Sequence, residues 1–86
     1  MEIEFYPAKD AINFAKHGLS LADAAAFELG SAVVLIDDRF EYGEVRYRAF
    51  GRVNGQGRCL AFALSGNAIR AISYRRAHDK EMRRYE

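Results

Sequence analysis

The chain has 86 residues, half of them hydrophobic, and a formal net charge of +1. This length is enough for one small domain, residues 1–86, with a single modest core. No apolar segment approaches the roughly 20 residues that span a bilayer, and the acidic N-terminus does not resemble a signal peptide, so we expect a cytoplasmic protein without membrane contact. The single cysteine, Cys59, lies in an apolar run, which predicts a buried free thiol and a reducing compartment.

The small net charge conceals an uneven distribution along the chain. Residues 1–45 hold three basic and nine acidic side chains, whereas residues 46–86 hold ten basic and three acidic ones. Nine of those ten basic residues are arginine, whose planar guanidinium suits bidentate contacts with phosphate. The second half is therefore expected to form a surface for RNA or another polyanion, unless the two halves simply neutralise each other in space.

The first residues predict a short strand and a helix. Alternating polar and apolar side chains at 2–5 indicate an edge strand. Pro7 suits the first position of a helix that continues to about Lys16, and Gly18 is expected to end it in the left-handed conformation. The helix should bury its apolar side chains and expose its polar ones: Ala11, Ile12, Phe14 and Ala15 inside, Lys9, Asp10 and Asn13 outside.

A second helix and a buried strand are predicted next. Ser20 followed by Asp23 has the pattern of a capping box, so a helix is expected over residues 21–29. The β-branched run at 32–36 predicts a buried strand. The two aspartates at 37–38 are expected to form a solvated turn rather than a cation site.

The remaining chain predicts a three-stranded meander. Residues 45–52 alternate between apolar and mainly basic side chains, and a turn at 54–57 leads to a strand at 59–64. A second turn, at 65–67, leads to a strand at 68–74. The predicted fold class is α+β, with a small antiparallel sheet, two N-terminal helices and one C-terminal helix.

The last strand and helix hold the highest density of chemically active side chains. A strand followed by a short polar helix would bring together three arginines, a histidine, a glutamate and a tyrosine: Arg70, Arg75, Arg76, His78, Glu81 and Tyr85. Such a group of cationic and proton-transferring side chains is suited to gripping phosphate.

Arginines on neighbouring strands extend this group. An antiparallel meander can place seven of them across one face: Arg46, Arg48, Arg52, Arg58, Arg70, Arg75 and Arg76. Three tyrosines are candidates for stacking on unpaired bases: Tyr47, Tyr74 and Tyr85. The alternative is a sheet whose outer face is rich in arginine only for solubility.

Other chemistries find little support in the sequence. The two histidines, His17 and His78, lie far apart, and no cysteine or histidine cluster has the spacing of a metal site. Phosphate-binding and dinucleotide-binding glycine motifs are absent. A nucleophilic Cys59 would need exposure, which its apolar strand disfavours. We predict neither a metal nor a cofactor.

Three groups of residues occur in the same order as in one known protein family. They are Phe5-Tyr6-Pro7-Ala8-Lys9 with Asn13 and Lys16-His17-Gly18-Leu19-Ser20; Gly43-Glu44-Val45-Arg46-Tyr47 with Gly51; and Ile69-Arg70-Ala71-Ile72-Ser73 with Arg75, Ala77, Glu81 and Tyr85. Over nearly its whole length the chain resembles the BrnT toxins of bacterial type II toxin–antitoxin pairs. The resemblance implies a RelE-like fold, a ribonuclease that arrests translation, and neutralisation by a BrnA-type antitoxin, through which alone the pair binds operator DNA.

The chain departs from the family pattern at two places. Tyr74 stands where the family usually has a small residue, and the turn Leu64-Ser65-Gly66 lacks the charged residues often found there. If the turn helps to hold RNA, the substrate preference differs in this chain.

Metal-free RNA cleavage requires a base for the 2′-hydroxyl, cations for the phosphorane and an acid for the leaving oxygen. We predict that Arg70 and Arg75, supported by Arg46, clamp the scissile phosphate. Glu81 and His17 are the first candidates for proton transfer, ahead of His78 and Tyr85. Further RNA contacts are expected from Lys16, Arg48, Arg52, Arg76 and Tyr85.

Two alternatives stay open at this point. Glu81 and Tyr85 could serve only to order the last helix against Arg75. The whole chain could also be a non-catalytic module that binds nucleic acid or docks its antitoxin without cutting RNA.

Overall fold

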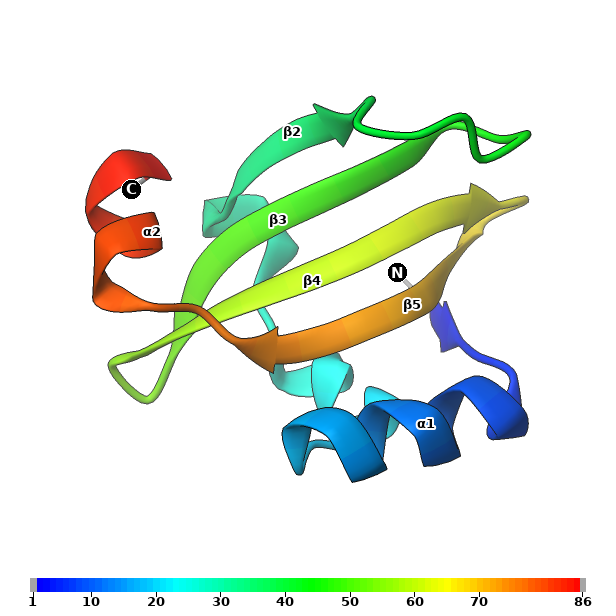
Figure 1. Ribbon diagram of the computed structural model, residues 1–86, viewed down its shortest axis with the longest axis horizontal. Helices are drawn as coiled ribbons and strands as arrows, with labels where there is room; N and C mark the ends of the chain where they lie inside the picture. The colour runs from blue at the N-terminus through cyan, green and yellow to red at the C-terminus, as the bar shows by residue number, and fades with distance from the viewer. Residues whose placement is uncertain (1, 86) are drawn as a thin grey trace.

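The computed structural model describes residues 2–85, which form a five-stranded mixed sheet with helices on both faces (Figure 1). The elements in chain order are β1 (Glu2–Glu4), α1 (Pro7–His17), the 3-10 helices η1 (Leu21–Ala26) and η2 (Leu29–Ser31), β2 (Val33–Asp37), β3 (Arg46–Val53), β4 (Gln56–Ser65), β5 (Ala68–Arg76) and α2 (Asp79–Tyr85). The strands lie in the order β1-β5-β4-β3-β2. None of the helices described over residues 2–85 is long and apolar enough to cross a membrane.

The sheet is only partly as predicted. Strands β2 to β5 form an antiparallel series in which neighbours in sequence are neighbours in space. The turn pattern predicted the meander of β3, β4 and β5 within this series. The expectation of a purely antiparallel sheet is wrong, because β1 pairs in parallel with β5, with Ile3 opposite Ile69. The pairing brings together the first strand and the last strand in the sequence, so no local sequence signal reveals it (Figure 1).

The two faces of the sheet differ in what covers them. The inner face lies under η1 and forms the main core, which contains Leu21, Ala24, Phe27, Ala49, Leu60, Phe62, Ile69, Ala71 and Tyr74. Helix α1 lies along the edge of β5, where Asn13 contacts the main chain of Tyr74. The outer face, on the opposite side, is covered at one end by α2, whose Met82 packs on Phe50 and the buried thiol of Cys59. A Cβ atom on Gly57 would lie 2.5 Å from Met82 Cγ, so α2 fits over this hairpin only because residue 57 is glycine.

Helix α1 turns Asn13 towards the sheet and its predicted apolar side towards solvent, which is opposite to the prediction, although Lys9 is exposed as expected. Asn13 is 4 % exposed, whereas Ile12 and Phe14 are 62 % and 61 % exposed. The Asn13 amide explains this: Nδ2 donates to the carbonyl oxygens of Leu19 (2.8 Å) and Tyr74 (2.9 Å), and Oδ1 accepts from the Tyr74 N–H (3.0 Å). These three bonds satisfy the buried amide and fix the rotation of the helix about its axis.

The segment after α1 begins as predicted and then departs. Gly18 ends α1 with φ 72°, and the capping box forms, with the Asp23 carboxylate accepting from the Ser20 N–H at 3.1 Å. The predicted helix over 21–29 is instead two short 3-10 helices. The chain becomes extended at Phe27 (φ −79°, ψ 125°), where that side chain enters the core, and this interrupts the helix.

Strand β2 also differs from its prediction. It is an edge strand, and Ile36 is 64 % exposed rather than buried, because only β3 pairs with it. The aspartate that ends it, Asp37, is buried rather than solvated. Arg39 Nε and Nη2 donate to its two oxygens at 2.8 Å each, and the hydrogen bonds from Arg39 hold the pKa of Asp37 well below its usual range.

We predict that Asn13→Ala lowers the free energy of unfolding by about 2–4 kcal/mol, because buried main-chain groups of Tyr74 and Leu19 lose their partner. Urea denaturation followed by circular dichroism measures this loss. The control is Lys9→Ala, an exposed residue of the same helix, which we expect to change stability by less than about 0.5 kcal/mol. Equal losses in the two variants would contradict the anchoring role of the amide.

Candidate active site

A cavity of about 400 Å³ lies where the end of α1, the end of β5 and the start of α2 meet. Its lining comes from these three segments: Lys16, His17, Arg75, Arg76, His78 and Glu81. The structure therefore brings together five residues that the sequence singled out for catalysis or RNA binding, together with His78.

The Asn13 anchor places His17 in this cavity. One helical turn separates the two residues, so both lie on the side of α1 that meets β5. Arg75 follows Tyr74, the main-chain partner of Asn13, and strand alternation directs it to the outer face. Gly18 then turns the chain away in the left-handed conformation.

Arg75 and Glu81 form a two-point ion pair at the floor of the cavity. Arg75 Nη1 and Nη2 donate to Glu81 Oε1 and Oε2 at 2.8 and 2.9 Å. Glu81 Oε1 also accepts the His78 N–H at 3.0 Å, which is one half of a capping box at the start of α2. The hydrogen bonds from Arg75 lower the pKa of Glu81 to about 2, so this carboxylate is a weak proton acceptor while the pair is intact.

His17 has the opposite character. Partial burial lowers its pKa below 6.5, and the positive charges of Lys16 and Arg75 lower it further. The imidazole is therefore neutral at neutral pH and has a nitrogen lone pair available to accept a proton.

A second cavity, of about 410 Å³, adjoins the first at His78 and Glu81. Its other lining residues are Arg48, Lys80, Arg84 and Tyr85. The Tyr85 ring stacks on Phe50 with centroids 4.5 Å apart, and the Arg48 guanidinium lies 5.8 and 6.0 Å from those two centroids. Within residues 2–85 the buried Nε of Arg48 makes no hydrogen bond.

Arg46 and Arg70 form a separate group around Glu44. Arg70 Nη2 lies 2.5 and 2.6 Å from the two Glu44 oxygens, and Arg46 Nε donates to one of them at 3.2 Å. The hydrogen bonds from Arg70, followed by the one from Arg46, lower the pKa of the Glu44 carboxyl. Arg70 pairs with Ala63 of β4, and Arg75 pairs with Cys59. These two partners are four residues apart, so Arg70 and Arg75 are separated by about 13 Å along the strand. The three arginines expected to clamp one phosphate are thus divided between two carboxylates.

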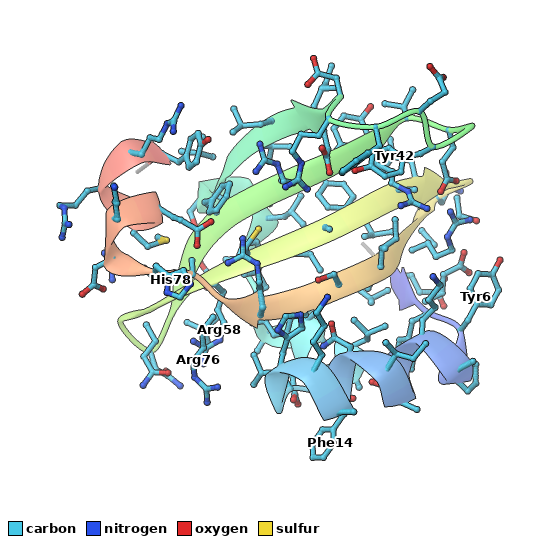
Figure 2. The ribbon with its side chains drawn as sticks, viewed as in Figure 1. Tyr6, Phe14, Tyr42, Arg58, Arg76 and His78 are labelled. Atoms are coloured by element: carbon cyan, nitrogen blue, oxygen red, sulfur yellow. The ribbon has the colours of Figure 1, made fainter. Side chains whose placement is uncertain are left out.

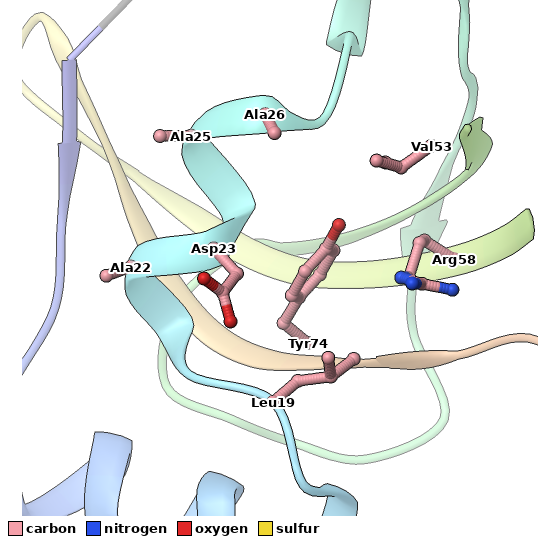
Figure 3. Close-up of a pocket in the computed structure, with 8 residues that line it drawn as sticks. All are labelled: Leu19, Ala22, Asp23, Ala25, Ala26, Val53, Arg58 and Tyr74. Carbon is pink, nitrogen blue, oxygen red and sulfur yellow. The ribbon is translucent and has the colours of Figure 1, made fainter.

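Two other arginines of the predicted basic face, Arg52 and Arg58, lie outside both groups. Arg52 is at the β3–β4 turn, where Nη1 donates to the Gly55 carbonyl at 2.9 Å. Arg58 is only 9 % exposed and lies with Tyr74 in a cavity of about 380 Å³ beneath η1, on the inner face (Figure 3). A single seven-arginine face is therefore wrong, because strand alternation puts Arg58 and its cross-strand partner Arg76 on the face opposite to Arg75. Arg76 still borders the His17 cavity, which lies where β5 ends.

Two of the predicted stacking tyrosines belong to the core. Tyr74 is 2 % exposed and meets Phe27 edge to face at 6.1 Å, and burial raises its pKa. Tyr47 stacks on Phe62 at 5.3 Å. Only Tyr85 borders a candidate site cavity.

The sequence reasoning missed some of the charged residues that the structure brings to these cavities. Lys80 and Arg84 line the second cavity, and their i, i+4 spacing on a short helix was the available signal. Glu44 was noted only as part of a motif, although it pairs with two arginines. Among residues 2–85, no three histidine, cysteine, aspartate or glutamate side chains form a group that could hold a metal ion.

Comparison with known proteins identifies the family. The model of a family described as the ribonuclease toxin BrnT of type II toxin–antitoxin systems matches residues 5–81, which include Lys16, His17, Arg75 and Glu81. No curated protein matches the chain. Because the match covers most of the sequence, the chain belongs to the BrnT family of ribonuclease toxins, whose partners are antitoxins.

Proposed function

We propose that this toxin is an endoribonuclease that cuts RNA through the 2′-hydroxyl without a metal ion, and that the cavity around His17 and Arg75 is its active site. The observation that carries the proposal is a neutral imidazole beside a cluster of fixed positive charges at an open cavity. The toxin would act on cytoplasmic RNA, inhibit translation, and be neutralised by a BrnA-type antitoxin that also supplies the contacts to operator DNA.

The residues of the cavity fit the steps of such a reaction. His17 accepts the proton of the 2′-hydroxyl, the 2′-oxygen bonds to phosphorus, and the bond to the 5′-oxygen breaks. Arg75, with Lys16 and Arg76 beside it, stabilises the charge of the phosphorane. His78, on another segment of the same cavity, is the candidate that protonates the departing 5′-oxygen. The products are a 2′,3′-cyclic phosphate and a 5′-hydroxyl.

Glu81 acts as a positioning residue in this mechanism. Its two hydrogen bonds hold the Arg75 guanidinium in the cavity, and its low pKa makes it a poor base. A phosphate that enters the cavity competes with this carboxylate for Arg75. Glu81 therefore maintains the site in the absence of RNA.

The remaining cationic groups would hold RNA on either side of the cut. Arg46 and Arg70 are placed to bind a phosphate farther along the strand, about 13 Å from Arg75. Arg48 and Tyr85 border the adjoining cavity, where an unpaired base could stack.

Arg75→Ala should lower RNA cleavage by about 10²–10³-fold and abolish growth arrest, because it removes the main stabiliser of the phosphorane. The control is Arg83→Ala, an exposed arginine of α2 that lines neither site cavity, which should remain as active as the parent. Antitoxin binding and the urea midpoint are measured in parallel to exclude unfolding. A folded Arg75→Ala protein that arrests growth like the parent would rule out the assignment.

The rate of cleavage should fall on the acid side with a midpoint below pH 6.5, because protonated His17 cannot act as a base and its pKa is lowered. His17→Gln should lower kcat by about 10²–10⁴-fold and remove this acid limb. His78→Gln is the matched comparison, and it should leave the acid limb in place. Loss of the limb in His78→Gln alone would transfer the role of base to His78.

Glu81→Gln should destabilise the fold at pH 7 by about 1 kcal/mol, as expected for a partly exposed ion pair. The folded pKa of Glu81 is depressed, so its contribution is complete above about pH 4.5 and is lost as the pH falls to about 2. The two proteins should therefore differ in unfolding free energy at pH 7 and agree near pH 2. A difference that does not depend on pH would contradict the ion-pair explanation.

A further inference from the structure

Helix α1 presents an apolar stripe to solvent. Ala8, Ala11, Ile12 and Ala15 lie at i, i+3, i+4 and i+7, on the side opposite Asn13. All four are exposed, Ile12 at 62 %, and Phe14 on the flank points away from the sheet (Figure 2). A helix of this kind normally turns such a stripe towards the core.

The helix cannot roll to bury the stripe. Its polar side is fixed by the Asn13 bonds to Tyr74 and by Asp10, whose Oδ1 accepts from Ser20 Oγ (3.0 Å) and from the Leu21 N–H (2.7 Å). Rotation would break these part-buried and buried bonds together. The stripe therefore stays exposed in the isolated toxin, as is typical of a surface that a partner covers.

The chemistry of the stripe defines its partner. Its three alanines leave room for larger apolar side chains around Ile12, so a second helix can approach closely. Lys9 and Lys16 lie along one edge of the stripe, both exposed, and neither forms an ion pair with another side chain among residues 2–85. The complementary partner is an amphipathic helix with bulky apolar residues and acidic residues on one flank.

We propose that the outward stripe of α1 is the docking surface for an acidic amphipathic helix of the antitoxin. The inference rests on the family assignment and on the proposed site, because the last turn of α1 carries Lys16 and His17 into the cavity. A partner helix that follows α1 to its C-terminal end covers the rim of that cavity. Binding and inhibition are thereby coupled through one helix.

The exposed edge strand β2 is the competing apolar surface. Ile36 there is as exposed as Ile12, but β2 is at the edge of the sheet opposite to β1 and β5, away from His17. Acidic residues follow it in the sequence, among them Asp38 and Glu41. A partner on this edge would not reach the site cavity directly, so it fits neutralisation less well.

The test compares Ile12→Lys with Ile36→Lys, two substitutions at matched exposure of 62 % and 64 %. Affinity for the purified cognate antitoxin is measured by calorimetry, and RNA cleavage by the toxin alone is assayed separately. Ile12→Lys should weaken antitoxin binding by about 30-fold or more, with cleavage unchanged, whereas Ile36→Lys should stay within about threefold of the parent. Lys9→Glu should also weaken binding, and this loss should shrink at high salt.

Parental affinity in both Ile12→Lys and Lys9→Glu would overturn the proposal, and a loss confined to Ile36→Lys would assign docking to β2. Both Ile12 and Lys9 are exposed, so we expect the variants to fold, which thermal unfolding verifies. A toxin that binds its antitoxin through α1 but cuts no RNA would contradict the proposed function and leave the docking surface intact.

Discussion

The amide of Asn13 takes the place of a strand neighbour at the edge of β5. Strand β1 pairs with β5 only as far as Arg70, and beyond it the main chain of Tyr74 both donates to and accepts from this side chain. A buried amide with three good bonds tolerates little displacement. The position of α1 is therefore set by polar contacts, whereas apolar packing sets the position of most surface helices.

Two consequences follow from this anchor. One turn after Asn13, His17 lines the same cavity as Arg75, which brings an imidazole and a guanidinium together. On the opposite side of the same helix, the apolar residues are left in solvent. The geometry of the proposed active site and the exposed apolar stripe of α1 thus arise from the same hydrogen bonds.

The uneven charge distribution allowed two interpretations, which were neutralisation between the two halves of the chain and a basic surface for RNA. The ion pairs of the arginines bear on both. Glu44, from the acidic half of the chain, neutralises Arg46 and Arg70 of the basic half. Arg75, in contrast, is paired within the basic half by Glu81. The arginines are therefore held in place by carboxylates, which a phosphate group can replace with similar bidentate geometry.

Local sequence signals predicted much of the fold and grouped several residues of the candidate site. Turn residues located the hairpins of β3, β4 and β5, and Gly18 ended α1 as expected. The residues that line the candidate site cavity could be named from the sequence because charged and imidazole side chains are concentrated at the end of α1, the end of β5 and the start of α2.

The sequence could not show how distant segments meet. Helical periodicity identified the two sides of α1 but not that a single amide, bonded across 61 positions, would turn the polar side inward. The parallel pairing of β1 and the burial of Tyr74 and Arg58 depend equally on contacts between distant residues.

The nature of the RNA ends that the purified toxin produces tests the central claim most directly. The proposed attack by the 2′-hydroxyl predicts 5′-hydroxyl and 2′,3′-cyclic phosphate ends in excess EDTA, and no cut where a deoxynucleotide replaces the attacking ribose. Products with 3′-hydroxyl and 5′-phosphate ends, or cleavage at the deoxy position, would contradict the role assigned to His17 and Arg75.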